Sequence, residues 1–436
     1  MTEPVLDRDA ELRRRLADLR RTGDLDLLWP DLPGVDRRRA MAGIKAVVHS
    51  MLGGESRLPV LAAADAHEAR VLGVAAFTSG MGSLLGWWIE EGRVEASPPA
   101  RELLGVHLRH GRRRSALLRE QASRIARGMH ASGLRPILLK GLHTGGEFFP
   151  HPSTRPAADI DILVSPTDRA RGGAVLADLG FTEVLRSVFG KRSEWSPSGS
   201  SPKMHSLELD HADNPWGVDL HETLGRWYFR GIRRELGWEP FDTMRFTDVC
   251  GESVRVLDQP YLTAFLALHA GYDLARVLLV RLFELVLVIR DDTERGRLDW
   301  GDLASLIERA ALGRFVYPAL VLAEELAPGT VEAGLLRRIA RDVSPRMHRV
   351  LDAVRRAEMG PLNEVSLDVK LAWAVGGKEL LMNLSDILVP SDDGAGSLME
   401  YYARRLSMAR WRISRRRVPG AQAPIVPPGG DGARGS

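Results

Sequence analysis

Short runs in which apolar and polar residues alternate lie in the middle of a chain whose two ends carry helical patterns. Residues 159–164 and 216–221 show this alternation, which is typical of strands because successive side chains of a strand point to opposite faces. Residues 136–139 form a short apolar run, as expected of a buried strand. Together with residues 181–184 and 254–257, these segments predict one β-sheet.

Apolar residues at helical spacing occupy most of the remaining sequence. Residues 116–130 predict an amphipathic helix that ends near Gly133 and leads directly into the strand at 136–139. Another helix is predicted from Pro166 to Leu179, with Gly180 after its last residue. We expect further helices over residues 10–21, 58–81, 261–290, 302–312, 317–325, 331–357 and 367–384.

A second alternating run precedes residues 216–221. Residues 204–210 have this pattern, and the turn-rich sequence 212–215 separates the two runs. They predict an antiparallel hairpin. Residues 191–201 are rich in serine, proline and glycine, and we expect a mobile loop there.

Three aspartates on these predicted strands are candidates for metal chemistry. Asp159 and Asp161 share one face of their strand, and the isoleucines beside them share the other. Neighbouring carboxylates repel unless a cation lies between them, and Mg²⁺ prefers oxygen ligands and commonly accompanies phosphates. Asp219 joins them if its strand lies beside 159–164, as general base or second-metal ligand. His221 shares the face of Asp219 and either takes part in the site or packs locally.

The spacing of these residues resembles the nucleotidyltransferase superfamily to which DNA polymerase β belongs. In that superfamily a glycine turn follows a strand, Asp-x-Asp lies on the next strand, and a third carboxylate lies on a later one. The chain is more closely similar to a branch of uncharacterised bacterial nucleotidyltransferases with Leu-Lys-Gly, Arg-Pro and Asp-x-Asp-x-Leu-Val motifs. The matching segments are 139–141, 155–156 and 159–164, followed by Leu-Gly-Phe at 179–181 and Asp-x-His at 219–221.

This resemblance implies an α+β fold, in which a polymerase β-like core with a mixed β-sheet is flanked by N- and C-terminal helical regions. We expect a helical region over residues 1–112, the core over 113–258, a helical domain over 259–418 and a disordered tail over 419–436. The close resemblance covers roughly residues 134–222.

The resemblance also implies roles for individual residues. Asp159, Asp161 and Asp219 would be catalytic and would hold Mg²⁺ or Mn²⁺. Lys140, Gly141 and Arg155 would bind the nucleotide, because a glycine turn lets backbone amides approach phosphate and the two cations offset its charge. The superfamily's Gly-Gly or Gly-Ser turn is Gly141-Leu142 here, so a hydroxyl contact to phosphate is missing, and Gly145-Gly146 is an alternative glycine pair.

The apolar stretch 261–290 is expected to pack beside the core as one long helix. Arg281 and Glu284 lie one turn apart on it and predict an ion pair on a helix interface, with a place on the acceptor side of the site as the alternative. Unpaired polar side chains are costly to bury, so the polar residues of this helix must face a partner, a cleft or water. They are His269, Tyr272, Asp273, Arg281 and Glu284.

Composition narrows the class of protein. A chain of 436 residues exceeds one compact core, so two or three domains are expected. The net charge of +3 gives little reason to expect nucleic acid as the partner, and the arginine-rich segment 404–417 predicts a solvated helix, with nucleic-acid, leader-peptide or anionic-lipid binding as the alternative. A single cysteine, Cys250, an N-terminus without a signal-peptide pattern and the absence of a transmembrane-like segment indicate a cytoplasmic protein.

These observations predict a metal-dependent nucleotidyltransferase. It would move a nucleotidyl group from an NTP, with ATP as the expected donor, to a hydroxyl or phosphate of a small molecule or peptide, and release pyrophosphate. The alternatives are a catalytically inactive binding or scaffold protein of the same fold, motivated by the altered glycine turn, and an enzyme acting on nucleic acid. If Asp161 faces an open cleft, its replacement by asparagine should stop turnover without harming the fold.

Overall fold

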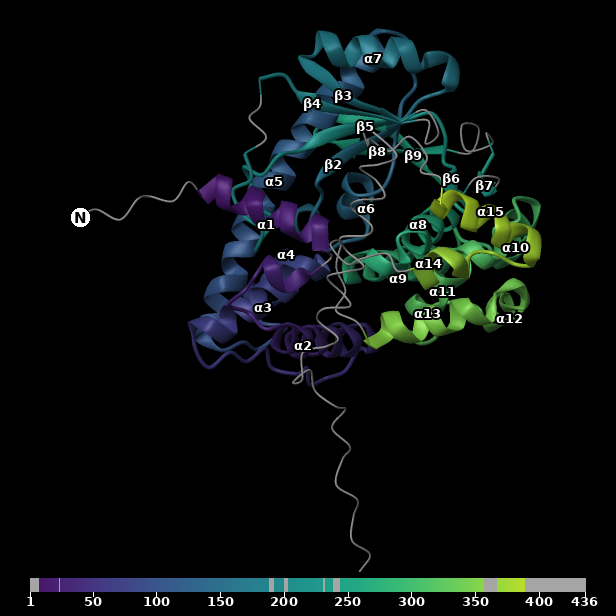
Figure 1. Cartoon of the computed structure of the whole chain (residues 1–436). Coiled ribbons are helices and arrows are strands. Elements are labelled where there is room, and N and C mark those ends of the chain that lie inside the picture. Colours follow the sequence, from purple (N-terminus) through teal and green to yellow (C-terminus); the bar gives the residue numbers. More distant parts are fainter. Residues whose placement is uncertain are drawn as a thin grey trace, which may run out of the picture.

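The computed structural model describes residues 8–22, 24–187, 192–199, 203–229, 232–237, 244–356 and 367–388. The arginine-rich segment 404–417 and the tail 419–436 lie outside the described residues. Figure 1 shows a β-sheet at one end of the molecule and two groups of helices beneath it, one from the N-terminal part of the chain and one from the C-terminal part.

The sheet has seven strands in the order β3-β4-β5-β2-β1-β9-β8. It is mixed, because β2 is parallel to β5 and β1 is parallel to β9, while the other neighbours are antiparallel. A separate two-stranded ribbon consists of β6 (Arg226–Phe229) and β7 (Ile232–Arg234). The strands of the large sheet are β1 (Ile137–Leu138), β2 (Asp159–Leu163), β3 (Phe181–Ser187), β4 (Arg192–Pro197), β5 (Gly217–His221), β8 (Met244–Val249) and β9 (Glu252–Leu257).

The predicted hairpin of residues 204–210 and 216–221 is wrong. The antiparallel neighbour of β5 is β4, which lies within the segment expected to be a mobile loop. Trp195 explains this strand, because its buried ring packs against Gly173 of the helix that covers the sheet. Residues 203–210 form an irregular segment, in which the Asn214 side chain accepts hydrogen bonds from the amides of His205 and Ser206 at 2.8 and 3.1 Å.

One face of the sheet is covered by α5 (Pro98–Ala131) and α7 (Arg169–Asp178). The apolar side chains of β2 and β5 pack against these helices in a continuous core. The alternation seen in the sequence therefore leaves the aspartates of the same strands on the opposite face. Helix α5 begins at Pro98 rather than at residue 116, and proline is tolerated in the first turn of a helix. The helix runs unbroken through residues 112 and 113, where the boundary between the N-terminal helical region and the core was expected.

The N-terminal helices are α1 (Arg8–Thr22), α2 (Gly34–Gly53), α3 (Ala66–Ser79) and α4 (Gly82–Glu90). Helix α4 crosses α5 closely, because a Cβ added at Gly86 would lie 2.4 Å from the carbonyl oxygen of Leu104. No single described helix has the length and apolar composition needed to cross a membrane; α3 and α4 reach them only as a pair, bent by 117°.

The stretch 261–290 is two helices rather than one. Helix α8 (Tyr261–Tyr272) ends, a 3₁₀ turn (Leu274–Arg276) follows, and α9 (Leu279–Glu294) packs back against α8. Gly271, near the end of α8, lies against the backbone of Phe315, where an added Cβ would be 2.4 Å from the carbonyl oxygen. The remaining helices are α10 (Trp300–Arg309), α11 (Gly313–Leu326), α12 (Ala333–Ile339), α13 (Pro345–Arg356), α14 (Leu367–Ala372) and α15 (Gly377–Leu388).

The two groups of helices share one hydrophobic core. A single cluster of buried residues extends from α2 through α4, the β1 side of the sheet and α8 to α14. Phe283 of α9 lies in its middle and contacts Trp88 of α4 and Phe149 edge to face, with ring centroids 5.7 Å apart in both pairs. The helices that precede the sheet and those that follow it are therefore packed against each other.

Candidate active site

Asp161 and Asp219 face each other on two neighbouring parallel strands. The register of β2 and β5 places Asp161 opposite Asp219 and Leu163 opposite His221. Asp161 is only 3 % exposed, although the sequence predicted an aspartate that faces an open cleft. The approach of the strand that carries Asp219 to the strand that carries Asp161 is confirmed.

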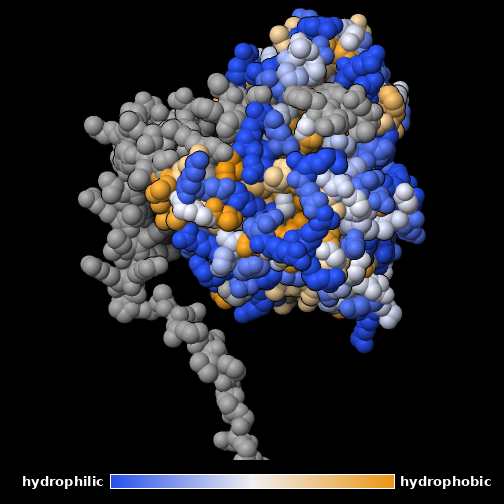
Figure 2. Space-filling model, turned by 90° about the vertical axis from the view of Figure 1, so that its right-hand side faces the viewer, coloured by the Kyte–Doolittle hydropathy of each residue, from blue (hydrophilic) through white to orange (hydrophobic). Residues whose placement is uncertain are grey.

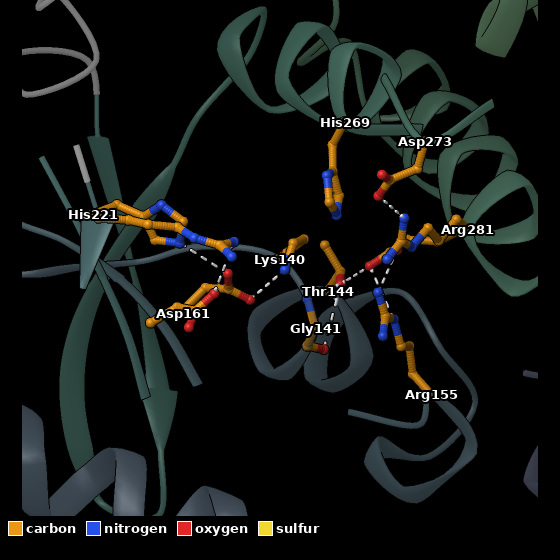
Figure 3. A network of polar contacts seen from close by, with 12 residues as sticks. Lys140, Gly141, Thr144, Arg155, Asp161, His221, His269, Asp273 and Arg281 are labelled. Atoms are coloured by element: carbon orange, nitrogen blue, oxygen red, sulfur yellow. Dashed lines mark hydrogen bonds and ion pairs between the residues drawn. The ribbon is translucent and has the colours of Figure 1, made fainter. Parts of the chain in front are cut away.

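Both carboxylate oxygens of Asp161 have partners. Lys140, two residues after the end of β1, forms an ion pair with Oδ2, and His221 Nε2 lies 3.1 Å from Oδ1 (Figure 3). Burial opposes ionisation of this carboxyl, but Lys140 and His221 hold its pKa well below its usual range. Burial also lowers the pKa of His221, against the attraction of Asp161, so the imidazole is neutral at pH 7. Asp161 is therefore ionised and held in place.

Asp219 has the opposite electrostatic character. Its buried position raises its pKa to about 7, and the negative charges of Asp161 and Asp159 contribute to this rise. Arg192 on β4, which the sequence analysis did not single out, is its only cationic partner among the described residues, with Nη1 3.4 Å from Oδ2. Two adjacent carboxyls with pKa values pushed apart are an arrangement suited to acid–base chemistry.

The side chains present fit a divalent cation. Asp161, Asp219 and His221 each offer one ligand atom, and these atoms lie within 4.8 Å of one another. A cation at this point would relieve the like-charge repulsion that raises the pKa of Asp219. The set differs from the expected one, because His221 takes part, while Asp159, at the half-buried start of β2, lies outside this group.

The turn after β1 contains Gly141, whose backbone φ angle is positive. Gly141 adopts φ +77°, a conformation that favours glycine, and stands immediately before the six-residue helix α6 (Leu142–Glu147). Its amide donates to Thr144 Oγ1 at 3.1 Å. The alternative pair, Gly145-Gly146, lies within α6, where added Cβ atoms would be 3.0 Å from Arg155 Cβ and 2.9 Å from Arg119 Nη1. Close packing against arginines therefore accounts for this second pair.

Arg155 and Glu284 form a buried, bidentate ion pair that links the segment before β2 to α9. Arg155 Nη2 donates to Glu284 Oε2 at 2.8 Å and Nε to Oε1 at 3.2 Å, and the Thr144 hydroxyl donates to Oε1 (Figure 3). The predicted pair of Arg281 with Glu284 is wrong, since Arg281 instead bonds Asp273 at 2.6 Å. Burial opposes ionisation of Glu284, but Arg155 and Thr144 keep its pKa below the usual value. This network fixes α9 beside the glycine turn.

A separate cavity of about 1210 Å³ lies among α10, α11, α12, α13 and residues 374–379. Figure 2, which views the right-hand side of Figure 1, shows a mainly hydrophilic face with hydrophobic patches on that side of the molecule. The cavity is lined by six arginines and three acidic residues, and it contains none of the three candidate metal ligands. It is therefore distinct from the carboxylate site.

Comparison with known proteins identifies the family of this chain. A family model described as an uncharacterised nucleotidyltransferase matches residues 69–328, from within α3 to just beyond α11. The chain belongs to this family. No curated protein and no solved structure matches it. The matched region is much longer than the motif-bearing segment 134–222 and includes helices that precede the sheet in the sequence and helices that follow it.

Proposed function

We propose that this chain transfers a nucleotidyl group from an NTP to a hydroxyl or phosphate of a small molecule or peptide, with release of pyrophosphate. The observation that carries the proposal is the facing pair of Asp161 and Asp219, with His221 beside them and the Lys140-Gly141 turn next to them. Membership in the nucleotidyltransferase family supports the class of reaction. We further propose a polymerase β-like core, ATP as the donor, a bacterial origin and a cytoplasmic location.

The roles of the residues follow from their charges. Asp161, Asp219 and His221 would hold Mg²⁺ or Mn²⁺, which when bound would offset the negative charge of the triphosphate and of the departing pyrophosphate. Lys140 is placed to meet phosphate as a point charge. Asp219, ionised once a cation is bound beside it, is suited to accept the proton of the acceptor hydroxyl. Asp159 adds negative charge beside this group and remains a candidate for a second ion.

Turnover can be tested directly. The purified chain would be given ATP, GTP, CTP or UTP with Mg²⁺ or Mn²⁺ and pools of hydroxyl-bearing small molecules and peptides, and pyrophosphate release and acceptor mass would be measured. We expect metal-dependent release and an acceptor heavier by one nucleotidyl group. Asp219→Asn should stop the reaction. Asp178→Asn, an exposed carboxylate of α7, is the matched control and should leave it unchanged.

A non-catalytic binding protein is the second candidate. It is favoured by one observation, which is that Lys140 and His221 already occupy both carboxylate oxygens of Asp161. A metal ion would have to share these oxygens with Lys140 and His221 or displace one of them. If the folded chain binds Mn²⁺ and nucleotide but releases no pyrophosphate with any NTP, this second function replaces the first.

A further inference from the structure

One cation beside the site has no carboxylate partner among the described residues. Four positive charges lower the pKa of His269 together with burial, and they belong to Arg281, Arg226, Lys140 and Arg155. Three of these cations are paired, with Asp273, Asp161 and Glu284. The guanidinium of Arg226, the first residue of β6, has one hydrogen-bond partner among the described residues, the ring of His269, with Nη2 2.9 Å from Nδ1, and it lies over the ring of Tyr272. Its charge is therefore not offset by any described acidic group.

The hydrogen bond between Arg226 and His269 determines which of their nitrogen atoms can still donate to a ligand. A guanidinium only donates, so His269 Nδ1 accepts, and the hydrogen of the neutral imidazole is on Nε2. This Nε2 is buried without a partner in the described structure, and so is Nε of Arg226. In Figure 3 the ring of His269 points from α8 toward Lys140. Buried N–H donors that lack an acceptor are costly, and a negatively charged acceptor is the group that best satisfies donors beside an unpaired guanidinium.

The position of Arg226 assigns this donor pair to one side of the site. In the sheet, β5 and β1 flank β2 on opposite sides. Lys140 and Gly141, which we assign to the triphosphate, follow β1, whereas β6 begins shortly after β5, the strand of Asp219 and His221. The hydroxyl that Asp219 would activate must lie on this β5 side. On this ground we assign an anion held by Arg226 to the acceptor; because His269 points toward Lys140, the test must also measure binding of the NTP analogue.

We propose that Arg226 and His269 form a subsite for an anionic group, a phosphate or a carboxylate, carried by the acceptor. This inference rests on the proposed function for its assignment to the acceptor. The substrate class that follows is a hydroxyl or phosphate compound with a negative charge close to the reacting oxygen. The hydroxyl of Tyr228 is a further buried group without a described partner, and its ring contacts Tyr272, over whose ring Arg226 lies.

Binding tests the subsite without requiring turnover. Inorganic phosphate and acetate would be titrated calorimetrically into the full chain saturated with Mg²⁺ and α,β-methylene-ATP, so that the nucleotide position is filled. We expect Arg226→Gln to weaken binding of the preferred anion at least tenfold, and Arg226→Lys, which keeps the charge, to weaken it less. The control is Arg234→Gln, since Arg234 is the cross-strand neighbour of Arg226 but lines the separate cavity. It should bind the anion like the wild type.

The outcomes separate the possible sources of the anion. Preference for phosphate or for acetate identifies which group the acceptor carries, and glycerol 3-phosphate should then react with a lower KM than glycerol in the wild type but not in Arg226→Gln. The inference is overturned if the wild type binds neither anion, if Arg234→Gln rather than Arg226→Gln loses binding, or if Arg226→Gln weakens only α,β-methylene-ATP. Arg226-dependent anion binding without pyrophosphate release would reject the proposed reaction and keep the anion subsite.

Discussion

Replacing Asp219 with asparagine should stabilise the metal-free protein at alkaline pH while it removes the metal site. The carboxyl has a folded-state pKa of about 7, compared with 3.8 ordinarily. Between these values the folded protein retains a proton that the unfolded chain has lost. The stability contributed by the protonated group is therefore fully present below about pH 4 and is lost as the pH rises through about 7. Asparagine has the same shape and carries no charge at any of these pH values.

The size of the effect follows from the pKa. A rise from 3.8 to about 7 corresponds to about 4 kcal/mol of destabilisation by the ionised group. The side chain is 14 % exposed, so solvent reduces this penalty, and we expect about 2 kcal/mol. For a chain of this length, that difference should raise the melting temperature of the variant at pH 8 by on the order of 2–5 °C. At pH 5 the difference should be much smaller, because the penalty accumulates as the pH rises from 3.8 to about 7 and vanishes only below about pH 4, where the carboxyl is protonated in the folded and the unfolded chain.

The assay is thermal melting of the wild type and Asp219→Asn between pH 5 and pH 8 in the presence of a chelator. Asp178→Asn serves as the control, because this exposed carboxylate should show no difference that depends on pH. Addition of Mn²⁺ at pH 8 should stabilise the wild type and not Asp219→Asn. If the melting temperatures of wild type and variant do not diverge as the pH rises, then burial and the charge of Asp161 do not destabilise the ionised form of Asp219 in the folded protein.

Three further predictions concern the site and its surroundings. Binding of Mn²⁺ should release the proton of Asp219, so the calorimetric heat should depend on the buffer below about pH 7 and not above about pH 8.5; a heat independent of the buffer throughout would contradict this. Glu284→Gln should lower the free energy of unfolding by about 3–5 kcal/mol, because it leaves Arg155 buried without its counter-charge. Adding Arg155→Met should recover part of this loss in denaturant melts, and an additive loss would refute the coupling. A chain ending at Leu257 should be insoluble and inactive, because it loses α8 and α9 from the shared core; a soluble, active fragment would show that the helices are an independent module.

Local patterns in the sequence were sufficient for the strands that carry the aspartates. Alternation around Asp161 and Asp219 predicted β2 and β5, and the proximity of these strands brought the two carboxyls together as expected. The strand β4 was missed because its serines resemble a loop, and only the packing of Trp195 against α7 accounts for it. Because this strand was not predicted, Arg192, which lies 3.4 Å from the carboxylate of Asp219, was not identified either.

Pairings between distant residues could not be predicted in the same way. Glu284 and Arg155 are separated by 129 positions, whereas Arg281 is one helical turn away, so a local rule selected the wrong partner. The break between α8 and α9 was also missed, because the apolar pattern continues through the 3₁₀ turn at Leu274–Arg276. The burial of Asp161 likewise depends on Lys140 and His221, which come from two other strands or their ends. Its replacement by asparagine should therefore cost stability as well as turnover.

The position of Phe283 has a consequence for how this family can change its substrates. Phe283 belongs to α9, the helix that also supplies Arg281 and Glu284, and its ring is held between Trp88 and Phe149. A sequence change that rotates or shifts α9 must therefore be accommodated by an N-terminal helix that does not reach the carboxylates. Selection for a new acceptor would act on both groups of helices at once, and exchange of the C-terminal helices between relatives should succeed only when α4 is exchanged with them.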